Sequence, residues 1–349
     1  MIDAMRERGV LAAMGAALLF GAGTPLAKRL LEAADPWLLA GLLYAGSGIG
    51  LFIYRRIRRA PPATLARRDF AWLAAAIVSG GMIGPALLML GLSGMPASGA
   101  SLLLNAEGVF TALLAWFVFR ENFDRRIALG MVLIVAGAVV LSWPGEARIG
   151  AAASALAILG ACLAWGLDNN FTRKVALSDA TFIAMAKGLV AGTTNIVLAL
   201  ALGASFPRLS AVAGAAVLGF FSYGVSLVLF VVALRELGTA RTGAYFSTAP
   251  FAGAVLALVL LGEPITVQLA VAGALMAAGI WLHLTERHVH THEHEALDHD
   301  HEHEHDEHHR HTHGSPVLPG ERHSHRHLHE PSRHSHPHYP DSHHLHEHD

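Results

Sequence analysis

Cysteine and charged residues are scarce over most of this chain. Its one cysteine, Cys162, lies in an apolar run, so the 349 residues contain no disulfide framework and no cluster of thiolate metal ligands. Charged residues make up 15% of the chain, which is low for a soluble protein. The sequence also lacks a phosphate-binding Gly-Lys-Ser/Thr loop, a nucleophile elbow and an HExxH motif. We therefore expect neither an enzyme nor a nucleic-acid-binding protein, and a chain that requires no cofactor.

Histidine is missing from the first 282 residues and concentrated in the last 62. All 24 histidines lie at or after His283, and 13 of the 27 acidic residues follow Arg287. The net charge of −2 therefore averages two unlike regions. The tail, residues 288–349, is dominated by His, Pro, Ser and charged side chains, which cannot build a core. On composition it is predicted to be disordered.

The sequence before the tail is apolar enough to be a membrane protein. It contains ten apolar runs of roughly 20 residues, the length that crosses a bilayer as a helix. The runs are Val10–Leu30, Trp37–Ile57, Phe70–Leu92, Pro96–Phe119, Ile127–Trp143, Ile149–Phe171, Ala180–Leu202, Ala211–Leu234, Thr239–Leu261 and Ile265–Leu284. None shows the period-two alternation of a membrane barrel, and lipid offers the backbone no partner outside a helix. The predicted fold class is an all-α integral membrane protein with ten transmembrane helices.

One long segment of the chain occurs twice. The stretch Gly94–Trp143 has small residues, an apolar run, a charged turn and a second apolar run, and the same order returns from Gly238. A shift of 142 positions places Glu121 on Glu263. Such a repeat indicates two fused copies of one membrane unit, and five helices per copy would make the copies cross the bilayer in opposite senses. The predicted domains are a first five-helix repeat (residues 1–146), a second inverted repeat (147–287) and the tail (288–349).

Lys and Arg are unevenly distributed between the predicted loops. Alternate connections, beginning with the N-terminus, hold 16 of these residues, against 4 in the opposite set. Because Lys and Arg favour cytoplasmic loops, both termini are predicted to be cytoplasmic. The expected location is the inner membrane of the cell, with the lipid bilayer as a partner. Whether the chain forms a homodimer is left open.

The repeat and its turns resemble the EamA-type transporters of the drug/metabolite transporter (DMT) superfamily. The features that carry the resemblance are the five-plus-five repeat, the turn Gly262-Glu263-Pro264 with Arg120-Glu121 at the matching place, and the glycine pairs Gly130…Gly137 and Gly273…Gly279. Glycines of this kind allow close helix approach. The resemblance implies a small-molecule permease, often an exporter of amino acids or other metabolites, with a central cavity between its halves. The tail is not part of the usual family pattern.

Glu107 is the principal candidate for a substrate-binding or coupling residue. It lies near the middle of the fourth apolar run, where a carboxylate is costly and usually faces a cavity or a partner. It could couple protons or bind a substrate amine. The alternative is a protonated glutamate that is hydrogen-bonded to a neighbouring helix. A helix break is expected beside it, at Gly108.

Six further residues are candidates for the wall of a substrate cavity: Thr24, Trp165, Asp168, Asn169, Tyr245 and Pro250. Thr24 precedes Pro25, where a helix break could free carbonyls, and Pro250 is expected to distort the ninth helix near its centre. The polar residues from Trp165 to Asn169 could instead form an interfacial helix end. Lys187 is expected to extend its long side chain to water.

The tail is predicted to bind divalent transition metals, because imidazole is a favoured ligand of Zn²⁺, Ni²⁺, Co²⁺ and Cu²⁺. The candidate ligands are His299, His301, His303, His305, His308, His309, His311 and His313. The leading functional hypothesis is a permease that exports a small organic metabolite or amino acid by alternating access. The alternatives are a transition-metal exporter fed by the tail, and a membrane-anchored metal buffer or sensor. Against a metal pathway, residues 10–282 contain no histidine.

Overall fold

The computed structural model divides into two compact units, Met1–Glu286 and Arg287–Asp349, which are described separately. The residues that the structure describes are 2–60, 67, 69–118, 125–143, 149–175, 179–237, 242, 245–284, 289–294, 297–303, 323–329 and 332–337.

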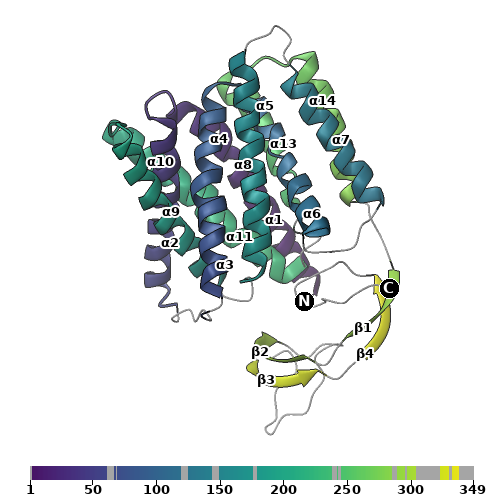
Figure 1. The fold of residues 1–349 in the computed structure, drawn as a ribbon. Coiled ribbons are helices and arrows are strands. Elements are labelled where there is room, and N and C mark those ends of the chain that lie inside the picture. The colour runs from purple at the N-terminus through teal and green to yellow at the C-terminus, as the bar shows by residue number, and fades with distance from the viewer. Residues whose placement is uncertain are drawn as a thin grey trace. The chain divides into compact units, whose positions relative to one another are not determined.

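The first unit is a bundle of long helices (Figure 1). In chain order they are α1 (Ile2–Leu30), α2 (Pro36–Ile57), α3 (Asp69–Ala76), η1 (Ile77–Ile83), α4 (Gly84–Ser93), α5 (Ala97–Leu103), α6 (Ala106–Phe117), α7 (Arg125–Ser142), α8 (Ile149–Arg173), α9 (Ala180–Ala201), α10 (Leu209–Gly219), η2 (Phe220–Val225), α11 (Ser226–Leu237), α13 (Ala249–Leu261) and α14 (Val267–Leu284). The segments η1 and η2 are π-helical and continue the helices on either side of them.

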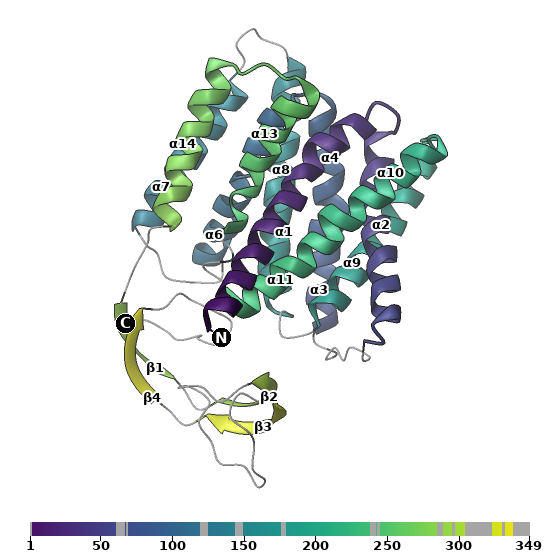
Figure 2. The same cartoon turned by 180° about the vertical axis from the view of Figure 1, so that it is seen from behind.

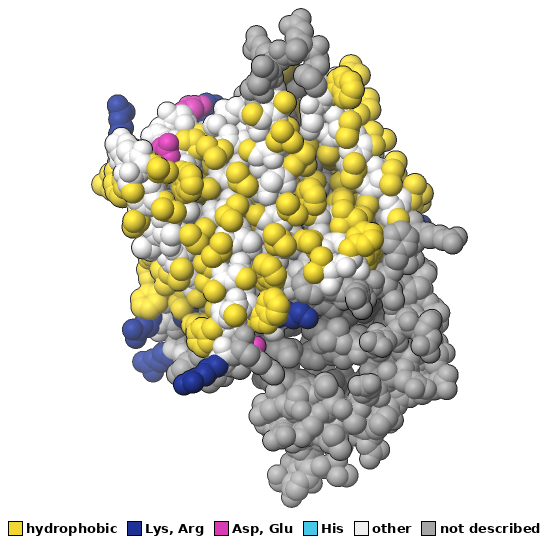
Figure 3. All heavy atoms as spheres, in the orientation of Figure 1, with side chains coloured by type: hydrophobic (Ala, Val, Ile, Leu, Met, Phe, Trp, Pro, Cys, Tyr) yellow, Lys and Arg dark blue, Asp and Glu magenta, His cyan; other side chains and the backbone are white. Residues whose placement is uncertain are grey.

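Seven helical segments in the described part of the chain are long and apolar enough to cross a membrane. They are Arg8–Leu30, Pro36–Ile57, Asp69–Ser93, Ala97–Leu114, Ala152–Thr172, Ala180–Ala201 and Leu209–Ala233, and three shorter apolar helices are Ala128–Ser142, Ala249–Leu261 and Val267–Leu282. Figure 3 shows hydrophobic side chains over the middle of one face, with Lys and Arg near its edges. An outer surface of this kind suits contact with lipid. The first unit is therefore a multi-pass membrane body.

Helices that are far apart in the sequence pack against each other in pairs. The most extensive contacts join α2 to α9, α7 to α14, α1 to both α11 and α13, and α8 to both α4 and α6. Figures 1 and 2 show α7 and α14 side by side along one edge of the bundle. Each pair joins a helix from before residue 146 to one from after it, so the two halves of the chain share one packed interior.

Glycines allow the closest of these helix contacts. At the crossing of α2 and α9, a Cβ atom added to Gly188 would lie 2.6 Å from the backbone nitrogen of Gly48. Between α7 and α14, a Cβ atom added to Gly279 would lie 2.5 Å from the carbonyl oxygen of Gly130, and one added to Gly137 would lie 2.7 Å from Met276. The expectation that glycines permit close helix approach is confirmed for Gly137 and Gly279, whereas the α2–α9 crossing was not predicted.

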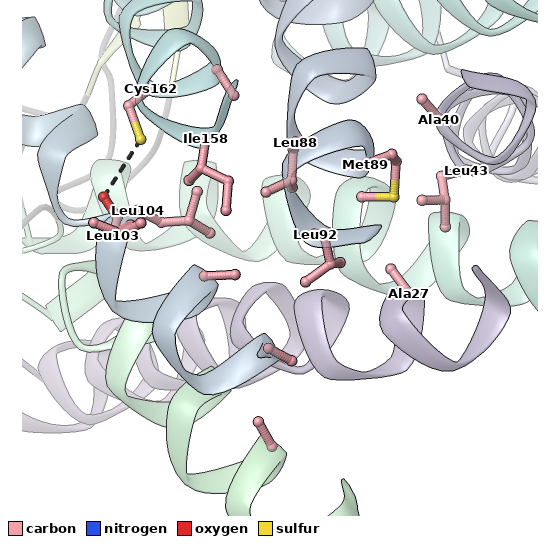
Figure 4. Packing of buried hydrophobic residues seen from close by; sticks show 14 of the residues in the cluster. Ala27, Ala40, Leu43, Leu88, Met89, Leu92, Leu103, Leu104, Ile158 and Cys162 are labelled. Carbon is pink, nitrogen blue, oxygen red and sulfur yellow. Dashed lines mark hydrogen bonds between the residues drawn. The ribbon is translucent and has the colours of Figure 1, made fainter. Parts of the chain in front are cut away.

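The main hydrophobic core lies where α1, α4, α5 and α8 meet (Figure 4). Leu88, Met89 and Leu103 are fully buried there. Cys162 is also buried in this core, and its thiol points toward the carbonyl oxygen of Leu103, with Sγ and O 3.6 Å apart. The single cysteine is thus part of the packing between α5 and α8.

The two π-helical segments lie within longer helices, at matching positions of the two halves. The segments η1 and η2 begin at residues 77 and 220, which are 143 positions apart, close to the 142-position shift of the sequence repeat. A π-helical turn widens the helix and displaces its carbonyls, and such turns are frequent at functional sites. Both segments were missed by the sequence analysis.

The helix of the fourth apolar run is broken, but not where the sequence predicted. The structure places the break at Leu104 and Asn105, between α5 and α6, and Gly108 lies inside α6. The backbone nitrogens of Leu104 and Asn105 bond to the carbonyls three residues earlier, and the Asn105 side chain donates to Leu102 O at 2.9 Å. An asparagine side chain that competes for a helix carbonyl favours a break at its own position, whereas glycine only permits one.

Of the two prolines that were expected to distort helices, only Pro250 lies beside an interruption. The described residues change from helix at 245–246 to a turn at 247–248, and Pro250 lies in the first turn of the helix that follows, α13, so the ninth apolar run is interrupted near its centre as predicted. The missing N–H of this proline costs little there, because the first-turn donors have no partner within the helix. At Thr24 and Pro25 the predicted break is absent, since α1 runs without interruption from Ile2 to Leu30.

The second unit contains four strands, β1 (Val289–His294), β2 (Leu297–His303), β3 (His323–His329) and β4 (Ser332–Pro337). They form two antiparallel two-stranded sheets, β1 with β4 and β2 with β3. The prediction that this tail is disordered is therefore corrected for these four segments. A His-x-His sequence alternates with the period of a strand, and strand pairing satisfies the backbone without requiring a core.

Asp179 caps α9 and ties it to the end of α2. One carboxylate oxygen accepts hydrogen bonds from the backbone nitrogens of Thr181 (2.8 Å) and Phe182 (3.2 Å), and the other pairs with Arg55. Partial burial opposes ionisation, but the hydrogen bonds from Arg55 and Thr181 outweigh it and lower the pKa of Asp179. A depressed folded-state pKa stabilises the fold above the unfolded value of about 3.9, and this contribution is lost as the pH falls through the lower folded value.

We expect Asp179→Asn to keep the cap of α9 but lose the ion pair. The variant should unfold at a lower temperature than the parent at about pH 7, and the difference should shrink as the pH falls below about 3.9, where the carboxylate of the unfolded chain begins to take up a proton. Thermal unfolding in detergent in the two pH ranges measures this. Equal destabilisation in both would show that the charge of Asp179 contributes nothing.

Candidate functional site

The carbonyl oxygen of Gly80, in η1, receives two side-chain hydrogen bonds. The Trp165 indole nitrogen donates to it at 2.9 Å, and the Tyr44 hydroxyl donates at 2.9 Å. Trp165 lies on α8, Tyr44 on α2, and the indole is only 6% exposed. A π-helical turn supplies a carbonyl that its own helix does not use, so Gly80 organises three helices around one backbone atom.

Asp168, one turn farther along α8, forms an ion pair with Lys187 on α9. The Lys187 Nζ lies 2.6 and 2.5 Å from the two carboxylate oxygens, and the Thr172 hydroxyl donates to the same carboxylate at 2.8 Å. The two charged side chains are 9% and 14% exposed. The prediction that Lys187 extends to water is wrong, because a buried carboxylate one helix away offers the ammonium a stronger partner.

Glu107 lies on α6, and its hydrogen-bonding partner lies on the neighbouring helix α8. Its Oε1 accepts from the Asn169 side-chain amide at 2.9 Å, and that amide nitrogen also lies 3.2 Å from the Thr111 hydroxyl. Glu107 is half-buried and Asn169 is exposed. Among the described residues, Glu107 therefore has an amide rather than a cation as its partner. This contact fits the alternative of a hydrogen bond to a neighbouring helix and is also compatible with a binding role.

The adjacent residues Asp168 and Asn169 link α8 to charged side chains on two other helices. Asp168 binds Lys187 on α9, while Asn169 binds Glu107 on α6. With both carboxylates ionised, the cluster holds two negative charges and one positive charge. In a membrane interior such a cluster attracts a cation, which can be a proton or an ammonium group. We call these residues and Thr111, Thr172, Trp165, Tyr44 and Gly80 the α8 polar cluster.

Three of the predicted site residues lie outside the α8 polar cluster. Thr24 is buried on α1, beside Gly23, where an added Cβ atom would lie 3.3 Å from Ser222 of η2. The Tyr245 carbonyl accepts hydrogen bonds from the Thr248 backbone and hydroxyl, and Pro250 opens α13. Within the described residues, none of the three makes a hydrogen bond to the cluster. The predicted residues that the structure brings together are Glu107, Trp165, Asp168 and Asn169.

An aromatic contact connects the cluster to η2. The rings of Tyr44 and Tyr223 have centroids 5.4 Å apart, and Tyr223 also contacts Phe20 of α1 at 5.8 Å. The two π-helical segments are thus linked through Tyr44, which bonds to η1 and contacts η2. Sequence analysis missed Tyr44, Gly80 and Tyr223. The signal that could have found η1 is Gly80-Gly81 followed by Gly84-Pro85 in the centre of an apolar run.

The predicted metal ligands of the tail are only partly described. His299, His301 and His303 lie in β2, whose register places them opposite His327, His325 and His323 of β3. The other predicted ligands, His305, His308, His309, His311 and His313, lie outside the described residues. Among the residues that were described, no group of three or more His, Cys, Asp or Glu side chains is placed to hold a metal ion. The metal-binding prediction is not tested by this arrangement.

Many apolar helices packed around a half-buried carboxylate and a buried ion pair are typical of a membrane transport protein. The chain belongs to the EamA-like transporter family, whose model matches it twice, over residues 7–143 and 152–285. The resemblance that the turns and glycines indicated is confirmed, and the two matches correspond to the two copies of the sequence repeat.

Similar proteins agree with this assignment. An uncharacterized transporter of Methanothermobacter thermautotrophicus is 29% identical over 292 residues, which are 78% of this chain and 85% of that protein. A protein of Salmonella typhimurium named "Probable amino-acid metabolite efflux pump" is 28% identical over 211 residues, 55% of this chain and 68% of that protein. A solved crystal structure aligns with a TM-score of 0.60 at 20% identity, covering 78% of this chain and 94% of the other, and shows the fold alone.

Proposed function

We propose that the membrane unit has ten transmembrane helices in two inverted five-helix repeats. Seven long spans and three shorter apolar helices make ten. The family model matches each half separately. The packing supports the symmetry, because the pair α1 with α11 corresponds to α8 with α4 when the halves are exchanged. The paired irregularities at η1 and η2 support it as well.

We further propose that the chain is an inner-membrane permease that exports a small organic metabolite carrying an amine, such as an amino acid, by alternating access. The single observation that carries this proposal is Glu107, a carboxylate midway along an apolar segment whose partner is an amide. A substrate ammonium group or a proton would supply the missing cation. The printed name of the Salmonella typhimurium relative supports an amino-acid metabolite as the substrate class.

The Asp168–Lys187 pair has a different role in this proposal. Its charges satisfy each other, so it presents no unpaired charge to a substrate. It fixes α9 against α8, beside the residue that holds Glu107. The pair would therefore set the position of Asn169, and Asn169 would orient Glu107. Both termini are proposed to be cytoplasmic, on the unequal distribution of Lys and Arg.

An efflux experiment tests the proposed function. Cells that express the full chain are loaded with amino acids supplied as dipeptides, and the amino acids that leave the cells are measured. The full chain and a variant that lacks residues 288–349 should both raise efflux of at least one amino acid above that of cells with an empty vector. Cellular nickel, cobalt and zinc are measured in parallel. Loss of metal without loss of any amino acid would favour the metal-export alternative.

We also propose that the tail binds divalent transition metals as an accessory function. Its histidines alternate with other residues along β2 and face histidines across the β2–β3 ladder. Residues opposite each other on an antiparallel ladder have Cβ atoms about 5 Å apart, which suits two imidazoles on one metal ion.

The purified full chain is expected to bind more than one Zn²⁺ or Ni²⁺ ion, and replacing His299, His301 and His303 with Gln should remove part of that binding. Calorimetric titration in detergent measures the number of sites. The variant without residues 288–349 serves as the control and should bind none of this metal. Equal binding by the full chain and the tailless variant would contradict a metal site in the tail.

A further inference from the structure

Glu263 connects the second half of the chain to a helix of the first half. It follows Gly262, which ends α13 with a φ of +64°, a left-handed conformation that glycine adopts without strain. The two carboxylate oxygens of Glu263 then accept hydrogen bonds from the backbone nitrogens of Ala97 (2.7 Å) and Ser98 (2.9 Å). These are the first residues of α5, whose backbone donors have no partner inside the helix.

Lys28 secures the chain just before α5. Its Nζ lies 2.6 Å from the carbonyl oxygen of Leu92, 3.3 Å from that of Ser93 and 3.0 Å from that of Met95. Those carbonyls end α4 and precede α5. One cation and one anion therefore bind opposite sides of a single turn. They tie α1, the α4–α5 turn and the end of α13 together at one end of the bundle.

A movement of α5 away from α13 would also shift Glu107, which belongs to the α8 polar cluster. The break at Leu104 and Asn105 joins α5 directly to α6, and Glu107 is the second residue of α6. Just below the turn, α1, α5 and α13 are in contact: a Cβ atom added to Gly253 would lie 2.8 Å from the Ser101 hydroxyl and 2.7 Å from the carbonyl oxygen of Gly21. With Glu263 bound, α1, α5 and α13 are therefore held in contact at this end of the bundle.

We propose that Glu263 is a positioning residue that holds α5 against the end of α13 and so closes the end of the bundle opposite the start of α1. The inference rests on the proposed alternating access. Release of Glu263 would open this end during transport and would move the helix segment that leads into the centre of the bundle.

Cysteine labelling tests this inference without requiring a substrate. Ser101 is 1% exposed and lies between Glu263 and the α8 polar cluster on α5, so Ser101→Cys is a small change that reports on closure. In whole cells, a membrane-impermeant maleimide should label Ser101→Cys slowly. Adding Glu263→Gln should raise the labelling rate about tenfold, because two charge-assisted hydrogen bonds lose their charge.

Two controls separate opening from unfolding. Glu32→Gln, which removes an exposed glutamate beside Arg29, should leave the rate unchanged. Cys162 is buried and should stay unlabelled by a permeant maleimide in every variant that is folded. Labelling of Ser101→Cys that Glu263→Gln leaves unchanged, or that Glu32→Gln raises equally, would overturn the inference. A rise in labelling of Ser101→Cys that occurs only together with labelling of Cys162 would overturn it as well, because it would show that the protein had unfolded. Amino-acid efflux by the parent chain is scored separately, so failure of the proposed function would be recognised by itself.

Discussion

Replacing Glu107 with glutamine is expected to reduce amino-acid efflux by about 10- to 100-fold while leaving the protein folded. Glutamine has nearly the same shape and can still accept a hydrogen bond from Asn169, which now donates to Glu107 at 2.9 Å. Only the negative charge is lost. A hydrogen bond to a charged group contributes about 1.5 to 3 kcal/mol, so losing one such interaction between Glu107 and a substrate ammonium group corresponds to a loss of about 10- to 100-fold.

A matched variant shows whether the charge itself is responsible. Glu107→Asp keeps the carboxylate on a side chain that is one methylene shorter, so it should retain more efflux than Glu107→Gln. The midpoint of thermal unfolding should be similar for both variants. If Glu107→Gln exports like the parent, Glu107 is only a hydrogen-bonded packing residue, and the binding role fails.

Breaking the Asp168–Lys187 pair should have the largest effect on stability. Removing one partner of a buried ion pair leaves an uncompensated charge in a site of low polarity, which typically costs about 3 to 5 kcal/mol. Both side chains are largely buried, and Nζ lies 2.5 Å from the nearer carboxylate oxygen. We therefore expect Lys187→Met to lower the free energy of unfolding in detergent by about this amount, and Asp168→Asn to lower it as well.

The double variant Asp168→Asn with Lys187→Met is expected to be more stable than Lys187→Met alone, because no buried charge remains. A double-mutant cycle on thermal or denaturant unfolding measures the coupling. Arg208→Met, a change at an exposed arginine just before α10, serves as a control and should have little effect. Additive effects of the two single changes would show that the ion pair does not stabilise the packing of α8 against α9.

The sequence predicted the elements of this fold whose signal is local or repeated. Apolar runs gave the helices, the 142-position repeat gave the two halves that the family model also matches, and an intramembrane carboxylate indicated Glu107. Trp165, Asp168 and Asn169 were found because polar residues are rare in such runs. The structure then showed that one helix, α8, carries all three toward different neighbours.

The features that sequence analysis missed depend on how helices are rotated and spaced. Lys187 was expected to reach water because the sequence cannot show that Asp168 faces it across the α8–α9 contact. The break at Leu104 and Asn105 depends on a side chain competing for a helix carbonyl, and a search for glycine pointed three residues too far along, to Gly108. The π-helical segments follow from packing that no periodicity in the sequence records.

Counterflow in liposomes that contain only the purified chain tests the central claim most directly. Liposomes are loaded with one unlabelled amino acid, and uptake of the labelled form is followed for a panel of amino acids with the parent chain and Glu107→Gln. The account predicts transient accumulation of at least one labelled amino acid by the parent, with a large loss in Glu107→Gln. The absence of exchange for every amine-bearing solute, together with movement of Zn²⁺ or Ni²⁺ through the same liposomes, would contradict it.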